Sequence, residues 1–411
     1  LSSAASDVYK RQVADVGGGQ MYIKSKAEYL KSKGWDIFVY STTAGNFLID
    51  DFSQYESGVM KELLLPAYYY TLFKRKHLLK RMLMCCDICS YKQCVIESHS
   101  SSLSTWGELL AEQTRAKHLI FDITETPKCP PVLSSFMKFK FDRKELAFIH
   151  EKTMKSFFSN ENIPQCQCYH LPAYYTLPSI IDIDSSLIDT VRNFAADYVI
   201  GIIGRLDKPF VIMTISDIIT FLQKNNRKNT FVIIYIGGNA NGGEDIMKEI
   251  VKQYQMFDNV HLVMTGFLFP MPLRLIDQMD VCISNSGTAR AVRDVGVPVI
   301  TIDSNDFKPI GVLGVTTQNT LYRNDDEVKI EMHNVLNDVL THKELYLSTC
   351  VKEEKCKKDF AIHFSFLEET CQEKVYYSFS KLHYSFSLFC KKILIAIGGS
   401  AFYKKLSLIC N

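Results

Sequence analysis

The sequence predicts an α/β protein with two doubly wound, Rossmann-like domains that face each other across a cleft. Three observations carry this prediction. The chain has 411 residues, too many for one ordinary core and suited to two domains. Short apolar runs alternate with helical patterns along most of it, and such alternation builds parallel sheets through right-handed crossovers. Glycine-rich or serine-rich turns follow several of the runs.

The first half carries the weaker pattern. A helix with Ile23, Ala27 and Leu30 on one face follows three glycines, Gly17 to Gly19, and ends near Gly34. Residues 1–12 form a polar run that we interpret as a non-native scar or truncation. We expect an N-terminal, acceptor-side domain over residues 1–178, with a hinge near 178–186. Its predicted strands span 13–16, 36–41, 94–97, 118–122 and 169–172, and further helices span 103–116 and 142–160.

The second half is more regular. We expect a ligand-binding domain over residues 179–360, with helices between its strands. Residues 361–411 form a tail that is rich in Phe, Tyr, Ser and Lys. The predicted strands of the second half span 198–203, 230–236, 259–265, 280–283 and 298–302.

Composition narrows the function classes. The net charge of +2 provides no basic field for nucleic acid, so we expect no nucleic-acid partner. An odd number of cysteines, 13, favours a reducing, cytoplasmic compartment. No apolar run is long enough to be a membrane span. Two groups of residues are considered as metal ligands: Cys85, Cys86, Cys89 and Cys94, and Cys166, Cys168 and His170. Neither group has the spacing of a zinc site, so we interpret the cysteines as ordinary buried thiols and predict no metal site.

Two turns in the second half suit an anionic ligand. Arg205 and Lys208 follow the strand at 198–203, where a guanidinium and an ammonium can hold a diphosphate. Ser286, Gly287 and Thr288 follow the strand at 280–283 and begin a helix, whose first amides can bind phosphate. The alternatives are two solvated cations and a plain serine cap.

Other candidate positions follow strands or open a helix. Gly237 follows the strand at 230–236 and either contacts a nucleotide or belongs to a flexible loop. Gly18 and Gly19 open the first helix, where they either approach a ligand or make a tight turn.

Polar residues follow two strands of the first half. Glu97 and His99 lie at the end of one strand and Glu125 just after another. His99 can donate to a sugar hydroxyl, and Glu97 or Glu125 can orient an acceptor or take its proton. The alternative for each is a satisfied polar residue at a strand end.

Basic residues among apolar ones give a hint of membrane contact. The stretch 72–83 interleaves Lys and Arg with Leu, Phe and Met, and lysines flank the apolar run 393–397. A basic amphipathic helix can lie on an anionic membrane surface, although a solvated helix face is the plainer interpretation.

Five segments, in order, resemble one family. GGGQMYIKSKAEYLKSKGWDIFVYS resembles the opening of GT-B glycosyltransferases. IGIIGRLDKPF, NVHLVMTGF and DQMDVCISNSGTARAVRDVGVPVITID resemble the nucleotide-binding half of the large retaining family that includes glycogen and sucrose synthases. IGVLGVTTQNTLYR is similar to bacterial enzymes of surface-polysaccharide clusters.

The resemblance implies roles for individual residues. Arg205 and Lys208 would meet the diphosphate of a nucleotide sugar, the Ser286–Thr288 loop would contact phosphate, and His99 would lie near the sugar. No metal or separate cofactor would be needed, and the tail would cross back to the first domain. The family commonly carries two Glu residues eight apart before this segment's Gly-x-Pro-Val. Here Ala291 stands where the second would be, and Asp294, one turn on, is the candidate substitute for ribose binding.

These observations predict a hexosyltransferase. It would move a sugar from a nucleoside diphosphate to a hydroxyl of a glycan or lipid-linked glycan, in the cytoplasm or at the inner face of the membrane. A sugar-nucleotide epimerase and a non-catalytic GT-B partner subunit remain alternatives. A membrane-surface adaptor is a third.

Overall fold

The computed structural model describes residues 18–42, 55–84, 94–124, 128–158, 170–171, 173, 185–225, 229–238, 244–266, 268, 271–352, 360–363, 374–381 and 386–409. The chain forms two compact units. We call residues 26–173 and 359–411 the N-terminal unit, and residues 1–25 and 174–358 the C-terminal unit. The boundary between residues 25 and 26 falls inside helix α2, Gly18–Ser32.

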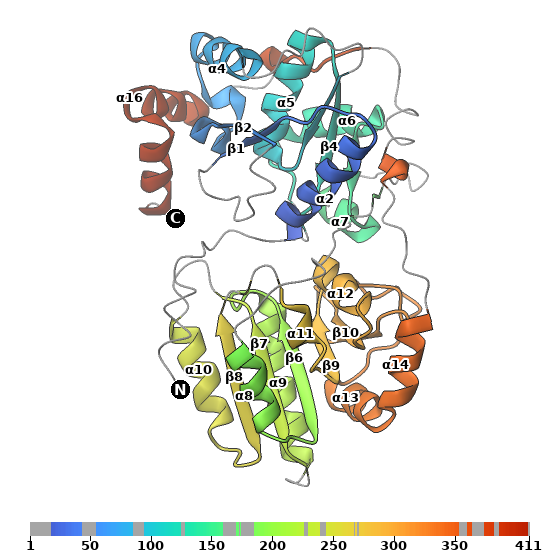
Figure 1. Cartoon of the computed structure of the whole chain (residues 1–411). Coiled ribbons are helices and arrows are strands. Elements are labelled where there is room, and N and C mark those ends of the chain that lie inside the picture. Colours follow the sequence, from blue (N-terminus) through green and yellow to red (C-terminus); the bar gives the residue numbers. More distant parts are fainter. Residues whose placement is uncertain are drawn as a thin grey trace. The chain divides into compact units, whose positions relative to one another are not determined.

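The C-terminal unit contains a six-stranded sheet with the order β11-β10-β9-β6-β7-β8 (Figure 1). All neighbouring strands are parallel except β10 and β11. The five predicted strands are confirmed. Strand β11 was not predicted, because Pro309 and Gly311 make this short segment resemble a turn. The strands are β6 Tyr198–Ile203, β7 Phe231–Ile236, β8 Val260–Gly266, β9 Val281–Ser284, β10 Val299–Ile302 and β11 Pro309–Val312.

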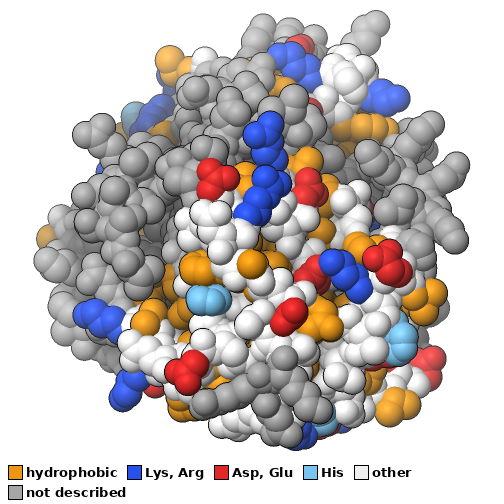
Figure 2. Space-filling view, turned by 60° about the horizontal axis from the view of Figure 1, so that its bottom comes forward, with side chains coloured by type: hydrophobic (Ala, Val, Ile, Leu, Met, Phe, Trp, Pro, Cys, Tyr) orange, Lys and Arg blue, Asp and Glu red, His pale blue; other side chains and the backbone are white. Residues whose placement is uncertain are grey.

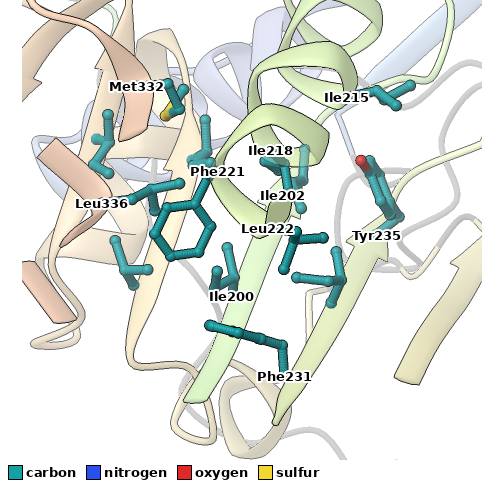
Figure 3. Close-up of a cluster of buried hydrophobic side chains, with 14 of the residues drawn as sticks. Ile200, Ile202, Ile215, Ile218, Phe221, Leu222, Phe231, Tyr235, Met332 and Leu336 are labelled. Atoms are coloured by element: carbon teal, nitrogen blue, oxygen red, sulfur yellow. The ribbon is translucent and has the colours of Figure 1, made fainter. Parts of the chain in front are cut away.

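Both faces of this sheet are buried, as in a doubly wound fold. On β7, Phe231, Ile233 and Tyr235 belong to one core, and Figure 3 shows Phe231 and Tyr235 on the side of the sheet that helix α9 (Pro209–Lys224) covers. The intervening Val232, Ile234 and Ile236 belong to the core on the opposite face. The helices of this unit are α8 Ser185–Asn193, α9 Pro209–Lys224, α10 Glu244–Tyr254, α11 Leu273–Ile276, α12 Ser286–Arg293, α13 Met332–Thr341 and α14 Lys343–Lys352.

The N-terminal unit contains a parallel three-stranded sheet, β3-β4-β5, and a parallel pair, β1-β2. The first predicted helix is confirmed as α2, and the helix predicted at 103–116 as α5. The basic stretch is the helix α4. The bounds are β1 Val39–Ser41, β2 Glu56–Val59, β3 Val95–Ser98, β4 Lys117–Asp122, β5 Leu146–Phe148, α4 Leu72–Met84 and α5 Ser101–Thr114, with 3-10 turns at Lys61–Leu64, Ala67–Tyr69 and Pro131–Leu133.

The helix predicted at 142–160 is wrong. The structure has α6 (Ser134–Asp142), then β5, then α7 (Glu151–Phe157). Lys144 adopts a φ of +58°, which ends the helical path, and the short run in β5 is fully buried beside β4. The side chain of His150 accepts from Lys152 N at 3.1 Å and starts α7 anew. The strand predicted at 36–41 covers only 39–41.

Other predictions lie outside the described residues. These are the strand at 13–16, Gly17, Glu125, most of the hinge, and every cysteine of the two candidate ligand groups except Cys94. Of the strand predicted at 169–172, His170 forms an isolated bridge with Phe148.

The described tail packs on the N-terminal unit. It comprises residues 360–363, a stretch at 374–381 with a 3-10 turn (Phe379–Lys381), and helix α16 (Phe386–Ile409), which bends at Gly399 (Figure 1). Phe379 and Leu388 join the core formed by α6 and β5, and Ile395 joins the core beneath α4. Tyr377 N donates to Glu108 Oε1 of α5 at 2.7 Å.

Acidic and basic side chains are interspersed on the face that Figure 2 shows. In the described part of the chain, no helix is long and apolar enough to cross a membrane.

Candidate functional site

Three loops are joined at the carboxyl edge of the C-terminal sheet. Gly204 N, after β6, donates to Ile236 O at 3.0 Å, and Gly237 N, after β7, donates to Gly266 O at 2.9 Å. Hydrogen bonding between the strands therefore continues into the loops. Strand β6 lies between β7 and β9, so the chain reverses its direction across the sheet here. This switch point is where open α/β sheets bind ligands.

Gly237 permits the close approach of two of these loops. Its φ is +152°, and a Cβ at this position would lie 1.9 Å from Gly204 O and 2.7 Å from Gly204 C. Any larger residue would push the β6 and β7 loops apart. Gly237 therefore has a structural reason to be glycine, whether or not it contacts a nucleotide.

Arg205 and Lys208 lie where β6 passes into α9. Lys208 N donates to Arg205 O at 3.0 Å in a tight turn, and Pro209 then opens the helix. The Arg205 side chain is 46% exposed, with Nε 3.2 Å from Asp207 Oδ1. The turn thus presents two cations beside the positive end of a helix, which is an arrangement that favours an anion.

Ser286 begins α12 directly after β9. It has a φ of +56°, which is unfavourable for a residue with a Cβ, and its N–H donates to Thr320 O at 3.0 Å. The preceding Asn285 does not cap the helix, because its Oδ1 accepts from Ile302 N at 2.9 Å. Gly287 and Thr288 lie in the first turn of α12, where backbone amides point toward the N-terminal end of the helix. Strained residues concentrate at functional sites.

Loops after β6 and β9 are held together. Ser284 Oγ, at the end of β9, donates to Ile203 O at the end of β6 at 2.8 Å. The structure therefore brings the Arg205–Lys208 turn and the Ser286–Thr288 turn to adjacent strand ends of one sheet.

In the N-terminal unit, Glu97 and His99 lie at the carboxyl end of β3. Glu97 Oε1 is 3.4 Å from His99 Nε2. His99 Nδ1 lies 3.2 Å from Phe121 O of the neighbouring strand β4. Since a carbonyl oxygen can only accept, His99 carries a proton on Nδ1. The predicted residues Glu97 and His99 thus lie side by side, with the imidazole held by β4.

Two residues that the sequence analysis missed complete this cluster. Lys26 of α2 pairs with Glu97 Oε2, and its Nζ lies 3.1 Å from His363 Nδ1 of the tail. Lys26 lies four residues after buried Tyr22, so a lysine on an apolar helix face was an available signal. No pattern around His363 indicates where it folds, because its contact partner lies 337 positions earlier in the chain.

Burial and neighbouring charges shift the pKa values of the titratable groups in this cluster. Burial alone would raise the pKa of Glu97, but Lys26 and His99 outweigh it, and the pKa falls to about 2. Burial and the nearby Lys26 lower the pKa of His99, against the opposing effects of Glu97 and Phe121 O. Burial raises the pKa of Asp122, the last residue of β4. Glu97 is therefore a carboxylate at neutral pH, and His99 is neutral.

A second polar network beneath the same sheet has the geometry of a catalytic triad. Ser98 Oγ is 3.0 Å from His118 Nε2, and His118 Nδ1 is 2.7 Å from Glu108 Oε2. All three residues are buried, and Glu108 also accepts from Lys140 Nζ at 2.9 Å. Because no member reaches solvent, the network is structural. Together with Tyr377 N, it fastens the tail to α5.

Solved structures that align with this chain include one named as a glycosyltransferase. A glycosyltransferase from Rickettsia africae aligns with a TM-score of 0.58 at 13% identity, over 86% of this chain and 97% of that one. Anabaena HepE in complex with UDP aligns with a TM-score of 0.55 at 14% identity, over 82% of this chain and 91% of that one. HepE in complex with UDP and glucose aligns with a TM-score of 0.53 at 13% identity, over 86% of this chain and 94% of that one. The chain has the GT-B fold. No protein-family model and no curated protein sequence matches it.

Within the GT-B fold, the C-terminal unit's predicted residues do not all come together. Asp294 follows α12 at its far end and pairs with Arg293 at 2.9 Å. An eight-residue helix spans about 12 Å, so Asp294 is not brought to the Ser286–Thr288 turn. Gly18 and Gly19 form the first turn of α2, and the glycine before them lies outside the described residues, as Glu125 does.

Proposed function

We propose that the chain is a glycosyltransferase that moves a hexosyl group from a nucleoside-diphosphate sugar to an acceptor hydroxyl, in glycan or surface-polysaccharide synthesis. The observation that carries this proposal is the pair of turns at the switch point, Arg205–Lys208 and Ser286–Thr288, on a GT-B fold. Structures of HepE contain UDP or UDP-glucose, which supports a nucleotide-sugar donor.

The proposed chemistry rests on stabilising the leaving diphosphate. Its negative charge grows as the sugar bond breaks, and preorganised donors lower the energy of that state. Arg205 and Lys208 would supply charge, and the first amides of α12 would supply directed hydrogen bonds. With two cations and two helix N-termini, this site would need no metal ion. Removing divalent ions with EDTA should leave donor binding unchanged.

The N-terminal unit would serve the acceptor. Glu97 is ionised, so it can accept a hydrogen bond from an acceptor hydroxyl or take its proton. Neutral His99 donates from Nδ1 to Phe121 O, so toward a sugar hydroxyl its Nε2 would accept, which reverses the donor role predicted from sequence. Glu125 stays a candidate for the same work.

The test is nucleotide-induced thermal stabilisation. UDP, GDP and their glucose and mannose conjugates are added to the protein and to Arg205→Ala and Lys208→Ala. A ligand at 100 times its dissociation constant stabilises by about 2.7 kcal/mol, and we expect most of this to disappear in both variants. Lys252→Ala is the control, because Lys252 is an exposed lysine in the last turn of α10, which leads away from this edge. No stabilisation of a folded protein by any of these nucleotides would contradict the proposal.

A non-catalytic GT-B partner subunit is the second candidate. It is favoured by Ala291, in the place of the family's second Glu, and by the distance of Asp294 from the site. Donor binding without either transfer or hydrolysis of the sugar would select this alternative. An epimerase would instead convert the bound nucleotide sugar without an acceptor.

Peripheral contact with an anionic membrane is part of the proposal. The outer face of α4 exposes Phe73 (84%) and Met84 (76%) at its two ends, with Lys76 and Lys80 between them, and the helix contains no acidic residue. This pattern suits a helix lying in the lipid headgroup region. Cosedimentation with phosphatidylglycerol vesicles should weaken in Lys76→Glu/Lys80→Glu and at high salt, whereas phosphatidylcholine vesicles should bind poorly throughout. Equal sedimentation of the variant and the unmodified protein would exclude this surface.

A further inference from the structure

We propose that His363 is a positioning residue for Glu97 and His99, because it holds the Lys26 ammonium against Glu97 by accepting a hydrogen bond at Nδ1. The roles of Glu97 and His99 toward substrate rest on the proposed function. The contacts themselves do not, so they can be tested separately.

The contacts form one continuous line across the N-terminal unit. His363 Nδ1 is 3.1 Å from Lys26 Nζ, Lys26 pairs with one oxygen of Glu97, and the other oxygen is 3.4 Å from His99. His99 ends the line on Phe121 O. The line therefore joins the tail, α2, β3 and β4. Its central ammonium has a carboxylate on one side and an imidazole on the other.

Aromatic packing fixes the His363 ring. The side chain is fully buried, and its ring meets Phe121 at 5.4 Å and Phe360 at 5.4 Å, both edge to face. Phe360 packs in turn on Tyr29, three residues after Lys26 on α2. The turn is closed by His363 N donating to Phe360 O at 2.9 Å. The tail thus brings a preset acceptor to Lys26.

The hydrogen bonds determine opposite tautomers for the two histidines. An ammonium can only donate, so His363 accepts at Nδ1 and carries its proton on Nε2. His99 donates from Nδ1 to a carbonyl oxygen. Lys26 would lose one of its restraints if His363 could not accept. The Glu97 carboxylate would then act on His99 with less opposition, and the pKa of His99 would rise.

Two variants of His363 separate hydrogen bonding from packing. His363→Phe keeps a ring against Phe121 and Phe360 but removes the acceptor. His363→Asn loses the ring but keeps an oxygen near the position of Nδ1. A purely structural role would make His363→Asn the more damaging of the two. The positioning role makes His363→Phe the variant that alters His99.

The readout is the titration of His99, followed by NMR with isotope-labelled histidine and assigned through His99→Gln. Groups acting on His99 are Glu97 from β3, Asp122 from β4 and Lys26 from α2, and His363 of the tail contacts Lys26. We expect the midpoint to rise by about one pH unit in His363→Phe, since a charge within about 4–6 Å moves a pKa by 1–3 units. It should stay near its original value in His363→Asn. The signal of His118 is the internal control. An unchanged His99 midpoint in folded His363→Phe would overturn the proposal.

A measurement without substitution keeps the proposal testable if the variants do not fold. At neutral pH, ¹⁵N shifts of the unmodified protein should show His363 protonated on Nε2 alone and His99 on Nδ1 alone. His363 protonated on Nδ1 would overturn the proposal. Neither experiment involves a sugar or a nucleotide, so both outcomes stand apart from the thermal-shift test of the donor site.

Discussion

The two candidate sites, one in each unit, are built from different kinds of structural feature. In the C-terminal unit, backbone geometry makes the site: glycines at close approaches, a strained serine and helix N-termini, with Arg205 exposed above them. In the N-terminal unit, side chains make it: the largely buried Lys26–Glu97 ion pair and the neighbouring His99. The folding of a site made by backbone geometry tolerates changes of exposed charge but no atoms added at the close approaches. A site of buried charges has the opposite sensitivities.

Because the two sites lie in different units, two optical signals can distinguish changes in one unit from changes in the other. Both tryptophans of the chain, Trp35 and Trp106, belong to the N-terminal unit. Their fluorescence therefore reports unfolding of that unit, whereas far-UV circular dichroism reports both. A two-unit protein need not unfold in one step, so the two signals can be compared directly during urea denaturation.

The largest effect should follow from breaking the buried ion pair with Lys26→Met. Removing one partner of a buried pair leaves the other charge uncompensated and costs about 3–5 kcal/mol. We expect the free energy of unfolding measured by tryptophan fluorescence to fall by this amount, so the midpoint of the transition moves to a lower urea concentration. The control is Lys155→Met, which breaks an exposed pair between Lys155 and Glu151 and should cost about 0.5 kcal/mol or less. Equal costs for the two variants would show that Lys26 is not paired as the structure has it.

A smaller effect should follow from adding one carbon at Gly237. In Gly237→Ala, the new Cβ would clash with the backbone of Gly204. We therefore expect the free energy of unfolding measured by circular dichroism to fall by about 2–3 kcal/mol. The transition measured by tryptophan fluorescence should not change. Gly266→Ala is the matched control. Its φ is also positive, at +67°, but nothing lies within 4 Å of the added Cβ, so only the conformational cost of about 1 kcal/mol applies. A Gly237→Ala loss as small as that of Gly266→Ala would mean that the two loops can separate.

The same difference explains what could be predicted from sequence. Strands of the C-terminal sheet are buried on both faces, so each appears as a continuous apolar run that ends where the turn residues begin. The turns at Arg205 and Ser286 could therefore be located. In the N-terminal unit, Glu97 and His99 could be found because they end a strand, but His363 could not, because a contact made by a distant tail leaves no local pattern. Strand β5 was missed because three buried residues between two helices resemble a helix interior.

The smallest effect, and the one that joins stability to function, concerns Ser286. A residue with a Cβ at positive φ costs about 1–2 kcal/mol, and glycine avoids this cost while adding about 0.5–1 kcal/mol of backbone entropy. Ser286→Gly should therefore leave the free energy of unfolding measured by circular dichroism unchanged or raise it by up to about 1.5 kcal/mol. Ser286→Ala keeps the strain and should show no such gain. Both variants lack the hydroxyl, so if it contacts phosphate, both should lose nucleotide-induced stabilisation to the same extent. Retained stabilisation in both would assign phosphate binding to the backbone amides alone. Destabilisation by Ser286→Gly would show that the positive φ is not strained, and that the serine side chain, not the backbone geometry, maintains this turn.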